Sequence, residues 1–325
     1  MERILVTGAG GFIGHHLVKK LKDEGKWVHG VDIIHPKFES SAADEYSLLD
    51  LRDLQNAQLP MKGIETVYAL AADMGGMGFI AFNHSQILQN NLRINLNTIQ
   101  SAIDHNVKNF FFSSSACIYP EFKQSEENVI ALKESDAFPA QPQDAYGWEK
   151  LTMEEIVRHH KNDFDLNVRI ARFHNVYGPN CEWKNGREKV PAAICRKVAR
   201  AKIYNKPEIE IWGDGNQTRS FTFITDCLEG ISLLMSSNYS EPINLGSDRL
   251  ISINELVDLV ASISGTKVTK KHIDGPQGVR GRNSDNTLIR KELGWAPSIS
   301  LEEGLRETYQ WVEAQVLEEY SQLES

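Results

Sequence analysis

Short apolar runs alternate with longer amphipathic stretches through the first half of the chain. Five of these runs, each bounded by turn-forming residues, have the length of strands that are buried on both faces of a parallel sheet. They lie at residues 3–7, 27–31, 66–70, 109–113 and 167–172. Three stretches between them, at residues 15–23, 87–105 and 145–160, carry apolar residues at helical spacing. This alternation predicts a doubly wound α/β fold around a parallel sheet, the Rossmann arrangement.

The pattern changes after Pro179. A basic stretch at residues 184–202 precedes a turn at 212–215, a strand near 219–224, and helices near 252–264 and 301–317. We interpret this part as a smaller, discontinuous C-terminal domain that binds substrate and shares segments with the first. The predicted Rossmann domain comprises residues 1–177 and about 216–246, and the predicted substrate domain comprises residues 178–215 and 247–325.

Composition narrows the possible functions. Of the 325 residues, 41% are hydrophobic and 24% are charged, which is ordinary for a globular protein. The formal net charge of −9 argues against general nucleic-acid binding, because neutralising phosphates needs a basic surface. No apolar run approaches the roughly 20 residues of a membrane helix, and no signal-peptide pattern precedes the first strand. The four cysteines lack metal-ligand spacing, so we expect no metal and a reducing, cytoplasmic location.

A glycine-rich turn joins the first predicted strand to the first predicted helix. Gly8, Gly11 and Gly14 have the spacing at which absent side chains let the backbone approach a pyrophosphate. The free N–H groups of the helix N-terminus would attract that anion. A glycine-rich turn without a ligand is the alternative, but the position of the turn in a βαβ unit favours dinucleotide binding.

Two acidic residues could bind the adenosine half of the dinucleotide. Asp32 ends the second predicted strand, where its carboxylate can accept hydrogen bonds from both ribose hydroxyls and would repel a 2′-phosphate. This favours NAD over NADP. Asp50 could accept from the adenine amino group. The alternatives are a solvated strand end for Asp32 and a plain turn residue for Asp50.

Tyr146 and Lys150 are four residues apart, which places both on one face of a predicted helix. The ammonium and a positive nicotinamide ring would favour the phenolate, so that Tyr146 could take the proton of a substrate hydroxyl while hydride leaves its carbon. Ser115, at the end of a strand, adds a hydroxyl that would orient the same oxygen. An exposed helical pair is the alternative for Tyr146 and Lys150 alone.

Two further residues could invert carbon centres beside a ketone. The C–H bonds next to a ketone are acidic because the carbanion delocalises into an enolate, and inversion needs one group on each face of the sugar. Cys117 lies two residues beyond Ser115, and Lys189 is a candidate partner from the second domain. The alternatives are a small buried residue for Cys117 and a surface cation or phosphate ligand for Lys189.

Ser115, Tyr146 and Lys150, together with the glycine-rich loop, resemble the extended short-chain dehydrogenases/reductases. Four longer segments resemble one family among them, the GDP-mannose 3,5-epimerases, and the resemblance spans nearly the whole chain. They are LAADMGGMGFI at 70–80, SSACIYPEFKQ at 114–124, QDAYG at 143–147 and GPQGVRGRNSDN at 275–286.

The resemblance implies a reaction and a set of contacts. In that family NAD oxidises C4 of the mannose, a Cys and a Lys exchange protons at C5 and C3, and C4 is then reduced again. The catalytic positions implied are Ser115, Cys117, Tyr146, Lys150 and Lys189. The cofactor contacts expected are Gly8, Gly11, Phe12, Ile13, Gly14, Asp32, Asp50, Leu51, Ala71, Tyr146 and Lys150. The substrate contacts implied are Gly75, Ser115, Ala116, Cys117, Asn175, Glu188, Lys189, Lys197, Gln217, Arg219 and Arg280.

The basic stretch at 184–202 also suits a diphosphate, although a solvated helix face would look the same. Arg219, Arg280 and Arg282 are better candidates because they lie among turns, where ligand-binding residues concentrate.

Two other functions remain open. A nucleotide-sugar 4-epimerase or 4,6-dehydratase would use the same Ser115, Tyr146 and Lys150, and Cys117 and Lys189 distinguish it from a 3,5-epimerase. A catalytically silent NAD-binding module is the other alternative. We further expect a homodimer, because the helices at 87–105 and 145–160 could pack against a second subunit.

Overall fold

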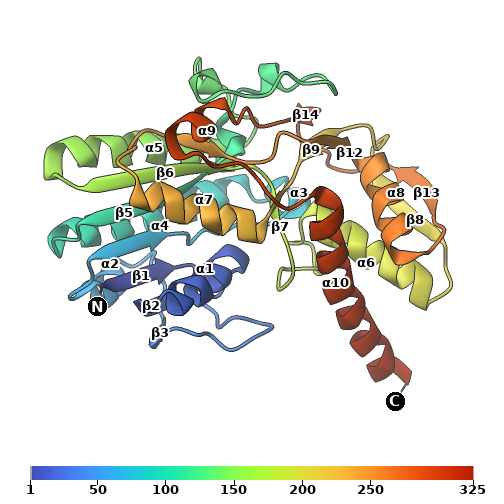
Figure 1. Ribbon diagram of the computed structural model, residues 1–325, viewed down its shortest axis with the longest axis horizontal. Coiled ribbons are helices and arrows are strands. Elements are labelled where there is room, and N and C mark those ends of the chain that lie inside the picture. Colours follow the sequence, from blue (N-terminus) through green and yellow to red (C-terminus); the bar gives the residue numbers. More distant parts are fainter. Residues whose placement is uncertain (1, 325) are drawn as a thin grey trace.

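A seven-stranded parallel sheet forms the centre of the computed structural model, which describes residues 2–324 (Figure 1). The strands run in the order β11-β6-β5-β4-β1-β2-β3. They are β1 (Arg3–Thr7), β2 (Trp27–Asp32), β3 (Glu45–Leu48), β4 (Thr66–Ala69), β5 (Asn109–Ser115), β6 (Asn167–Phe173) and β11 (Ile243–Leu245). The strand order reverses between β1 and β4, and ligands of doubly wound folds bind beside such a reversal, at the carboxyl ends of the strands.

Alternate residues of the strands enter the two cores that sandwich the sheet. Ile4 and Val6 of β1 pack with the core on one face, and Leu5 packs with the core on the other. Phe111 of β5 is likewise opposite to its neighbours Phe110 and Phe112. A strand that is covered on both faces needs apolar residues at every position, which explains its continuous apolar sequence.

Helices cover both faces of the sheet (Figure 1). Leu17 of α1 and Ile231 of α7 join the first core, whereas Ile99 of α4 and Met153 of α5 join the second. The helices around the sheet are α1 (Phe12–Asp23), α2 (Leu54–Gln58), α4 (His84–Asp104), α5 (Ala145–Phe164), α7 (Ile224–Ser236) and α9 (Thr287–Leu293). None of the described helices is both long and apolar enough to cross a bilayer.

The second set of elements packs beside the carboxyl edge of the sheet (Figure 1). Its helices, which contact one another, are α6 (Val190–Ile203), α8 (Ile253–Ser264) and α10 (Leu301–Glu324). One small sheet pairs β8 (Glu208–Trp212) with β13 (Thr269–Ile273), and another orders β12 (Leu250–Ser252), β9 (Thr218–Ser220) and β14 (Gly281–Arg282). The remaining elements are β7 (Val176–Tyr177), β10 (Thr222–Phe223), α3 (Met77–Ile80) and the 3₁₀ helices η1 (Leu59–Met61), η2 (Ala116–Ile118), η3 (Glu121–Lys123) and η4 (Glu134–Ala137).

Most predicted elements are confirmed, with ends shifted by a few residues. The five strands, the three helices between them, and the helices near 252–264 and 301–317 are all present. The single strand near 219–224 was wrong: two short strands lie there, and α7 begins at Ile224. Residues 219–224 are rich in β-forming residues, and the prediction joined the two short strands to the first residue of α7, which follows them without a turn. The division into two domains stays a prediction; α7 and β11 lie with the large sheet although β8 and β9 precede them.

Candidate active site

A cavity of about 960 Å³ lies between the carboxyl edge of the sheet and the second set of elements. Residues that follow β1, β4 and β5 line one side, and residues of α6, β8 and β9 line the other. The predicted site residues that line it are Gly8, Gly11, Phe12, Ile13, Gly14, Asp32, Asp50, Leu51, Ala71, Gly75, Ser115, Ala116, Cys117, Tyr146, Lys150, Asn175, Glu188, Lys189, Lys197, Gln217 and Arg219. Arg280 is absent from this lining, whereas Arg282 is part of it.

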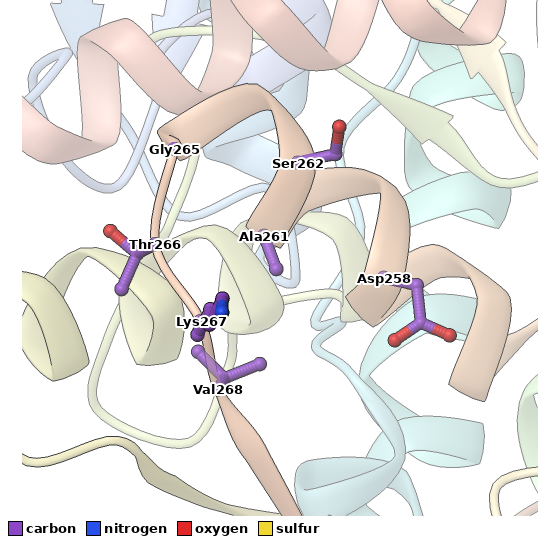
Figure 2. Close-up of a pocket in the computed structure, with 7 residues that line it drawn as sticks. All are labelled: Asp258, Ala261, Ser262, Gly265, Thr266, Lys267 and Val268. Atoms are coloured by element: carbon purple, nitrogen blue, oxygen red, sulfur yellow. The ribbon is translucent and has the colours of Figure 1, made fainter.

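A second, smaller hollow of about 450 Å³ lies at the C-terminal end of α8 (Figure 2). Its lining comes from one turn of the helix and the loop that follows, as the labelled side chains show. The one carboxylate there, Asp258, already pairs with Lys270 at 2.7 Å. Because none of the predicted catalytic residues lies in this hollow, we place the candidate site in the larger cavity.

The glycine-rich turn leaves no room for side chains. A Cβ on Gly14 would lie 2.0 Å from the carbonyl oxygen of Gly8, and Gly8 itself has a φ of +73°. Gly8 also packs against the backbone of Ala71, where an added Cβ would approach within 2.8 Å. The first helix, α1, begins with Gly11 as its N-cap, so its free N–H groups face the cavity. The turn therefore has the shape of a pyrophosphate cradle.

Asp32 fixes this turn from the end of β2. Its carboxylate accepts hydrogen bonds from the backbone N–H of Gly10 at 2.9 Å and of Ile33 at 2.7 Å. Burial raises the pKa of Asp32, and the hydrogen bond from Gly10 opposes that rise. Asp50 lies further along the same wall and pairs with Arg52, whose Nη2 is 2.6 Å away. Both carboxylates thus line the cavity, and their contacts with the adenosine half of the dinucleotide stay a prediction.

Tyr146 and Lys150 lie on the first turns of α5. Asp144 caps this helix by accepting from the backbone N–H of Gly147 at 2.9 Å. A Cβ on Gly147 would lie 2.1 Å from the carbonyl oxygen of Cys117, so α5 lies directly against η2. This close contact brings Tyr146 to the end of β5, where the Ser115 hydroxyl accepts from the backbone N–H of Cys117 at 3.1 Å.

Burial dominates the electrostatics of this pair. It raises the pKa of Tyr146 well above its ordinary value, while the hydrogen bond with Ser115 acts in the opposite direction. Burial also lowers the pKa of Lys150, and the negative charge of Glu149 opposes that effect. The Lys150 ammonium lies 5.6 Å from the centre of the Tyr146 ring. In the protein alone, Tyr146 therefore keeps its proton; the expectation that Lys150 and a positive nicotinamide ring together favour the phenolate stays a prediction.

Cys117 lies on η2 with its thiol against a guanidinium. Arg282 of β14 donates from Nη1 to Cys117 Sγ at 3.1 Å and from Nε to Gln124 Oε1 at 2.6 Å. No carboxylate among the described residues forms an ion pair with Arg282, which is 8% exposed. A buried, unpaired cation next to a thiol stabilises negative charge on the sulfur.

Lys189 approaches the cavity from the other side, as the N-cap of α6. Its side chain is accessible to solvent, but the surrounding protein displaces enough water to lower the pKa of Lys189. The thiol of Cys117 is the strongest of the groups that oppose this effect. An amine with a lowered pKa can accept a proton more readily at neutral pH than a solvated lysine can.

The predicted substrate residues form the far end of the cavity. Arg219 donates to the carbonyl oxygens of Thr218 and Val279, both at 2.7 Å, and has no carboxylate partner among the described residues. Burial lowers the pKa of Arg219. Gln217 is buried, and its Oε1 has no hydrogen-bond partner within the described structure. Arg219 is therefore available to an anionic group of a ligand, and Gln217 Oε1 is available to a hydrogen-bond donor such as a nucleobase.

Other predicted substrate residues are already held by the protein. The amide of Asn175 donates to the carbonyl oxygen of Ser220 at 2.9 Å, and Glu188 pairs with Arg196 at 2.6 Å. Lys197 donates to the carbonyl oxygen of Glu210. Arg280 lies outside the cavity, with its guanidinium paired to Glu127 and, at 2.6 Å, to Asp214. The structure therefore places Arg282 rather than Arg280 at the site.

The basic residues at 184–202 fall into two groups, those that pair with glutamates of α10 and those that line the cavity. Lys184 and Arg200 both pair with Glu319 of α10, at 3.1 and 2.7 Å. Lys202 pairs with Glu313 at 2.7 Å. Lys184, Arg200 and Lys202 thus attach the two ends of the stretch to α10, and the basic residues of the stretch that line the cavity are Arg187, Lys189, Arg196 and Lys197.

The fold and the site define a class of protein. The chain belongs to the NAD-dependent epimerase/dehydratase family, whose profile matches residues 4–246. NAD is therefore its cofactor, and the glycine cradle and Asp32 fit that cofactor.

Within that family the sequence is similar to one kind of enzyme. It is 51% identical over 319 residues to GDP-mannose 3,5-epimerase of Arabidopsis thaliana and 51% identical over 324 residues to GDP-mannose 3,5-epimerase 1 of Oryza sativa subsp. japonica. Both alignments cover 98% of this chain and 84% of the relative. The predicted relationship to these epimerases is confirmed.

Solved structures agree with the fold and the cofactor. UDP-glucose 4-epimerase of Thermotoga maritima, solved with UDP-glucose, superposes with a TM-score of 0.85 at 26% identity over 97% of this chain and 99% of that chain. The protein MoeE5, solved with UDP-glucuronic acid and NAD, has a TM-score of 0.82 at 27% identity over 96% and 99% of the two chains. The predicted Rossmann class and the NAD prediction are confirmed.

Proposed function

We propose that this protein is a GDP-mannose 3,5-epimerase, an isomerase that forms GDP-L-galactose and GDP-L-gulose. One observation carries the proposal beyond sequence similarity. Ser115, Tyr146 and Lys150 line the same cavity as a thiol and an amine from two different elements, Cys117 on η2 and Lys189 at the start of α6. The first three residues suit oxidation of a hydroxyl, and the other two suit proton exchange on either face of a sugar.

The first part of the chemistry belongs to Tyr146. Bound NAD supplies a hydride acceptor and a positively charged ring. Tyr146 takes the proton of the C4 hydroxyl, and the Ser115 hydroxyl holds the same oxygen in place. Because burial raises the pKa of Tyr146, the ammonium of Lys150 must be joined by a second positive charge before the phenolate becomes accessible. Oxidation of the C4 hydroxyl therefore requires NAD to be bound beside Tyr146.

The second part of the chemistry belongs to Cys117 and Lys189. Once C4 is a ketone, the C–H bonds at C3 and C5 are acidic. One of the two residues removes a proton as the enolate forms, and the other returns a proton to the opposite face. Arg282 donates a hydrogen bond to Cys117 Sγ, and the lowered pKa of Lys189 favours its neutral form as a base. Return of hydride to C4 completes an isomerisation with no net oxidation.

The diphosphate has two candidate ligands in the same cavity. Arg219 has only carbonyl partners among the described residues, and Lys197 lines the same cavity. Arginine binds phosphate through paired N–H groups, so Arg219 would hold the diphosphate and thereby orient the sugar. The unpartnered Oε1 of Gln217 is available to a donor on the substrate.

The alternatives use fewer of these residues. A 4-epimerase or a 4,6-dehydratase needs Ser115, Tyr146 and Lys150, but neither accounts for a thiol beside an unpaired arginine or for a lysine with a lowered pKa in the same cavity. A silent NAD-binding module would need none of the five. The sequence identities with the plant enzymes support the proposal of a GDP-mannose 3,5-epimerase over these alternatives.

Nuclear magnetic resonance of GDP-mannose incubated with the enzyme in deuterated water tests the proposal. We expect deuterium at C3 and C5 of the products. Cys117→Ala is expected to abolish that uptake while oxidation at C4 survives, and Lys189→Ala serves as the second variant. Unlabelled product inverted only at C4 would overturn the 3,5-epimerase proposal, and binding of NAD without turnover of any nucleotide sugar would support the silent module.

We further propose that the enzyme is a cytoplasmic homodimer. Helices α4 and α5 pack against each other, and each carries a large apolar side chain on its outer surface. Leu96 of α4 is 42% exposed and Trp148 of α5 is 44% exposed. A second copy of the chain could cover both.

A further inference from the structure

Lys189 lies at the end of a loop that has few contacts of its own. The loop turns at Asn185 and Gly186, which have φ angles of +73° and +83°, and α6 begins directly after Lys189. No strand or helix precedes Lys189 within this loop. A base that must reach one carbon of a bound sugar needs its backbone held in place, so something outside the loop has to fix it.

Arg187, two residues before Lys189, makes the contacts that fix the loop. Its guanidinium donates from Nη1 to the carbonyl oxygen of Met74 at 2.9 Å and from both Nη atoms to Asp73 Oδ1 at 3.2 Å. It also lies 3.8 Å from the centre of the Phe79 ring. One side chain from the substrate side therefore contacts three residues of the loop that follows β4.

The backbones of the two loops also touch. The N–H of Gly76 donates to the carbonyl oxygen of Arg187 at 3.0 Å. A Cβ on Gly76 would lie 2.3 Å from the carbonyl oxygen of Glu188, so only glycine permits this contact. The segment that carries Lys189 is thus joined to residues 73–79 by both backbone and side-chain contacts.

Asp73 is in turn anchored to α4. Its backbone N–H donates to Asn91 Oδ1 at 2.6 Å, and its Oδ2 accepts from Gln86 and Asn90, each at 3.0 Å. These hydrogen bonds and the charge of Arg187 hold the pKa of Asp73 below its ordinary value despite partial burial. The carboxylate therefore stays ionised and keeps its attraction for Arg187 near neutral pH.

The same helix holds the residues that oxidise C4. Asn95 of α4 donates to Glu149 Oε1 at 2.7 Å. Glu149 directly precedes Lys150 on α5, the helix that also carries Tyr146. Helix α4 therefore contacts both segments: Asn95 binds Glu149 of α5, and Asp73 with Arg187 links α4 to the loop that ends at Lys189.

We propose that Arg187 is a positioning residue for the proton-transfer step, acting with Asp73 to hold Lys189 at a fixed place relative to Tyr146. This role rests on the proposed function. Arg187 does not exchange protons itself; it keeps the amine in line with the carbon that becomes acidic after oxidation. Displacement of a reacting group by about 1 Å can cost on the order of 100-fold in rate.

Steady-state and burst kinetics of Arg187→Ala test this role. We expect formation of the inverted product to slow by roughly 100-fold in kcat, with KM for GDP-mannose changed by less than about threefold. The burst of reduced cofactor that follows substrate addition should persist, because Tyr146 keeps its supports. Arg187→Lys keeps the charge but loses the paired N–H groups. Its kcat should lie between those of the unaltered protein and Arg187→Ala.

Gly76→Ala and Arg249→Ala complete the design. Gly76→Ala leaves Arg187 intact but forces the two loops apart, so it should reproduce the loss of kcat and the retained burst. Arg249, whose ion pair with Glu302 lies outside the cavity, is the matched control and should behave as the unaltered protein. Bound NAD and the melting temperature show whether each variant is folded.

Two outcomes would overturn the role. A rise in KM with unchanged kcat would mean that Arg187 binds substrate uniformly, and kinetics equal to those of the unaltered protein would mean that the contact is dispensable. Absence of deuterium uptake with the unaltered protein would instead overturn the proposed function, and this role with it.

Discussion

Arg282 donates a hydrogen bond to the sulfur of Cys117 at 3.1 Å, from a position 165 residues later in the chain. The two residues lie on different small elements, β14 and η2, that meet only in the folded protein. Arg282 is buried, and Gln124 accepts from its Nε, which leaves Nη1 to donate to the thiol. The reactivity of Cys117 therefore depends on β14, from the second set of elements, as much as on η2, where Cys117 itself lies.

Arg282→Gln should slow alkylation of Cys117 by iodoacetamide on the order of tenfold at neutral pH, because the nearby cation stabilises the thiolate that reacts. Arg282→Lys keeps the charge and should lose less. Mass spectrometry of the peptide that contains Cys117 separates this thiol from the buried Cys195 and Cys227. Equal alkylation rates in all three proteins would contradict an electrostatic role for Arg282.

Gly14→Ala should abolish NAD retention, because the new Cβ would lie 2.0 Å from the Gly8 carbonyl oxygen and open the cradle. The measurement is the amount of NAD released from purified protein on denaturation. Gly25→Ala is the matched control: its φ of +75° makes an alanine strained, but nothing lies within 4 Å and it is outside the cavity. If Gly14→Ala kept its NAD, the turn would not be the pyrophosphate site.

His174 should make the fold sensitive to acid. It is fully buried, its Nε2 is 3.0 Å from Asn244 Oδ1, and burial lowers the pKa of His174 to about 3. The unfolded chain binds a proton near pH 6.5 and the folded protein does not, so stability is fully present above pH 6.5 and falls as the pH drops toward 3. The expected loss is about 1.4 kcal/mol per pH unit.

Urea unfolding between neutral and mildly acidic pH measures this dependence. His174→Gln removes the titrating group and should flatten the slope by about that amount per pH unit. His159→Gln, at an exposed position on α5, is the control and should leave the slope unchanged. An unchanged slope in His174→Gln would show that other groups cause the acid sensitivity.

Trp148→Glu should convert the proposed dimer into a monomer, because it replaces an exposed apolar side chain of α5 with a charge. Static light scattering at micromolar concentration measures the mass. Leu233→Glu is the control, since Leu233 is similarly exposed, at 37%, but lies on α7. A monomeric mass for the unaltered protein would remove the proposal of a homodimer.

Local patterns were enough to predict most strands and helices, and to predict which neighbouring residues lie together; the roles of those residues stay predictions. Gly8, Gly11 and Gly14 lie on one turn, and Tyr146 and Lys150 lie on one helix, so spacing along the chain is enough to bring each set together. The strands were readable because burial on both faces demands continuous apolar sequence. The site residues on the N-terminal side of the cavity are of this kind.

Contacts between residues far apart in sequence determine which of the predicted basic residues lie at the cavity, and spacing along the chain could not predict this. Arg280 and Arg282 are two residues apart among the same turns, yet Asp214 and Glu127 hold the first outside the cavity while Gln124 holds the second inside it. The basic stretch at 184–202 looks uniform, but pairing with Glu319 and Glu313 of α10 removes its two ends from the site. The partners of these cations are far away in sequence, so no pattern in the stretch itself identifies them.

The late position of α7 and β11 has a consequence for synthesis of the protein. β6 is made long before β11, its neighbour at the edge of the large sheet, and β8 and β9 are made in between. A nascent chain that stopped after β9 would display β6 as an open edge, which invites pairing with another chain. Expression of truncated forms should therefore yield aggregates rather than a smaller folded unit, and the growing polypeptide is most vulnerable between residues 173 and 243.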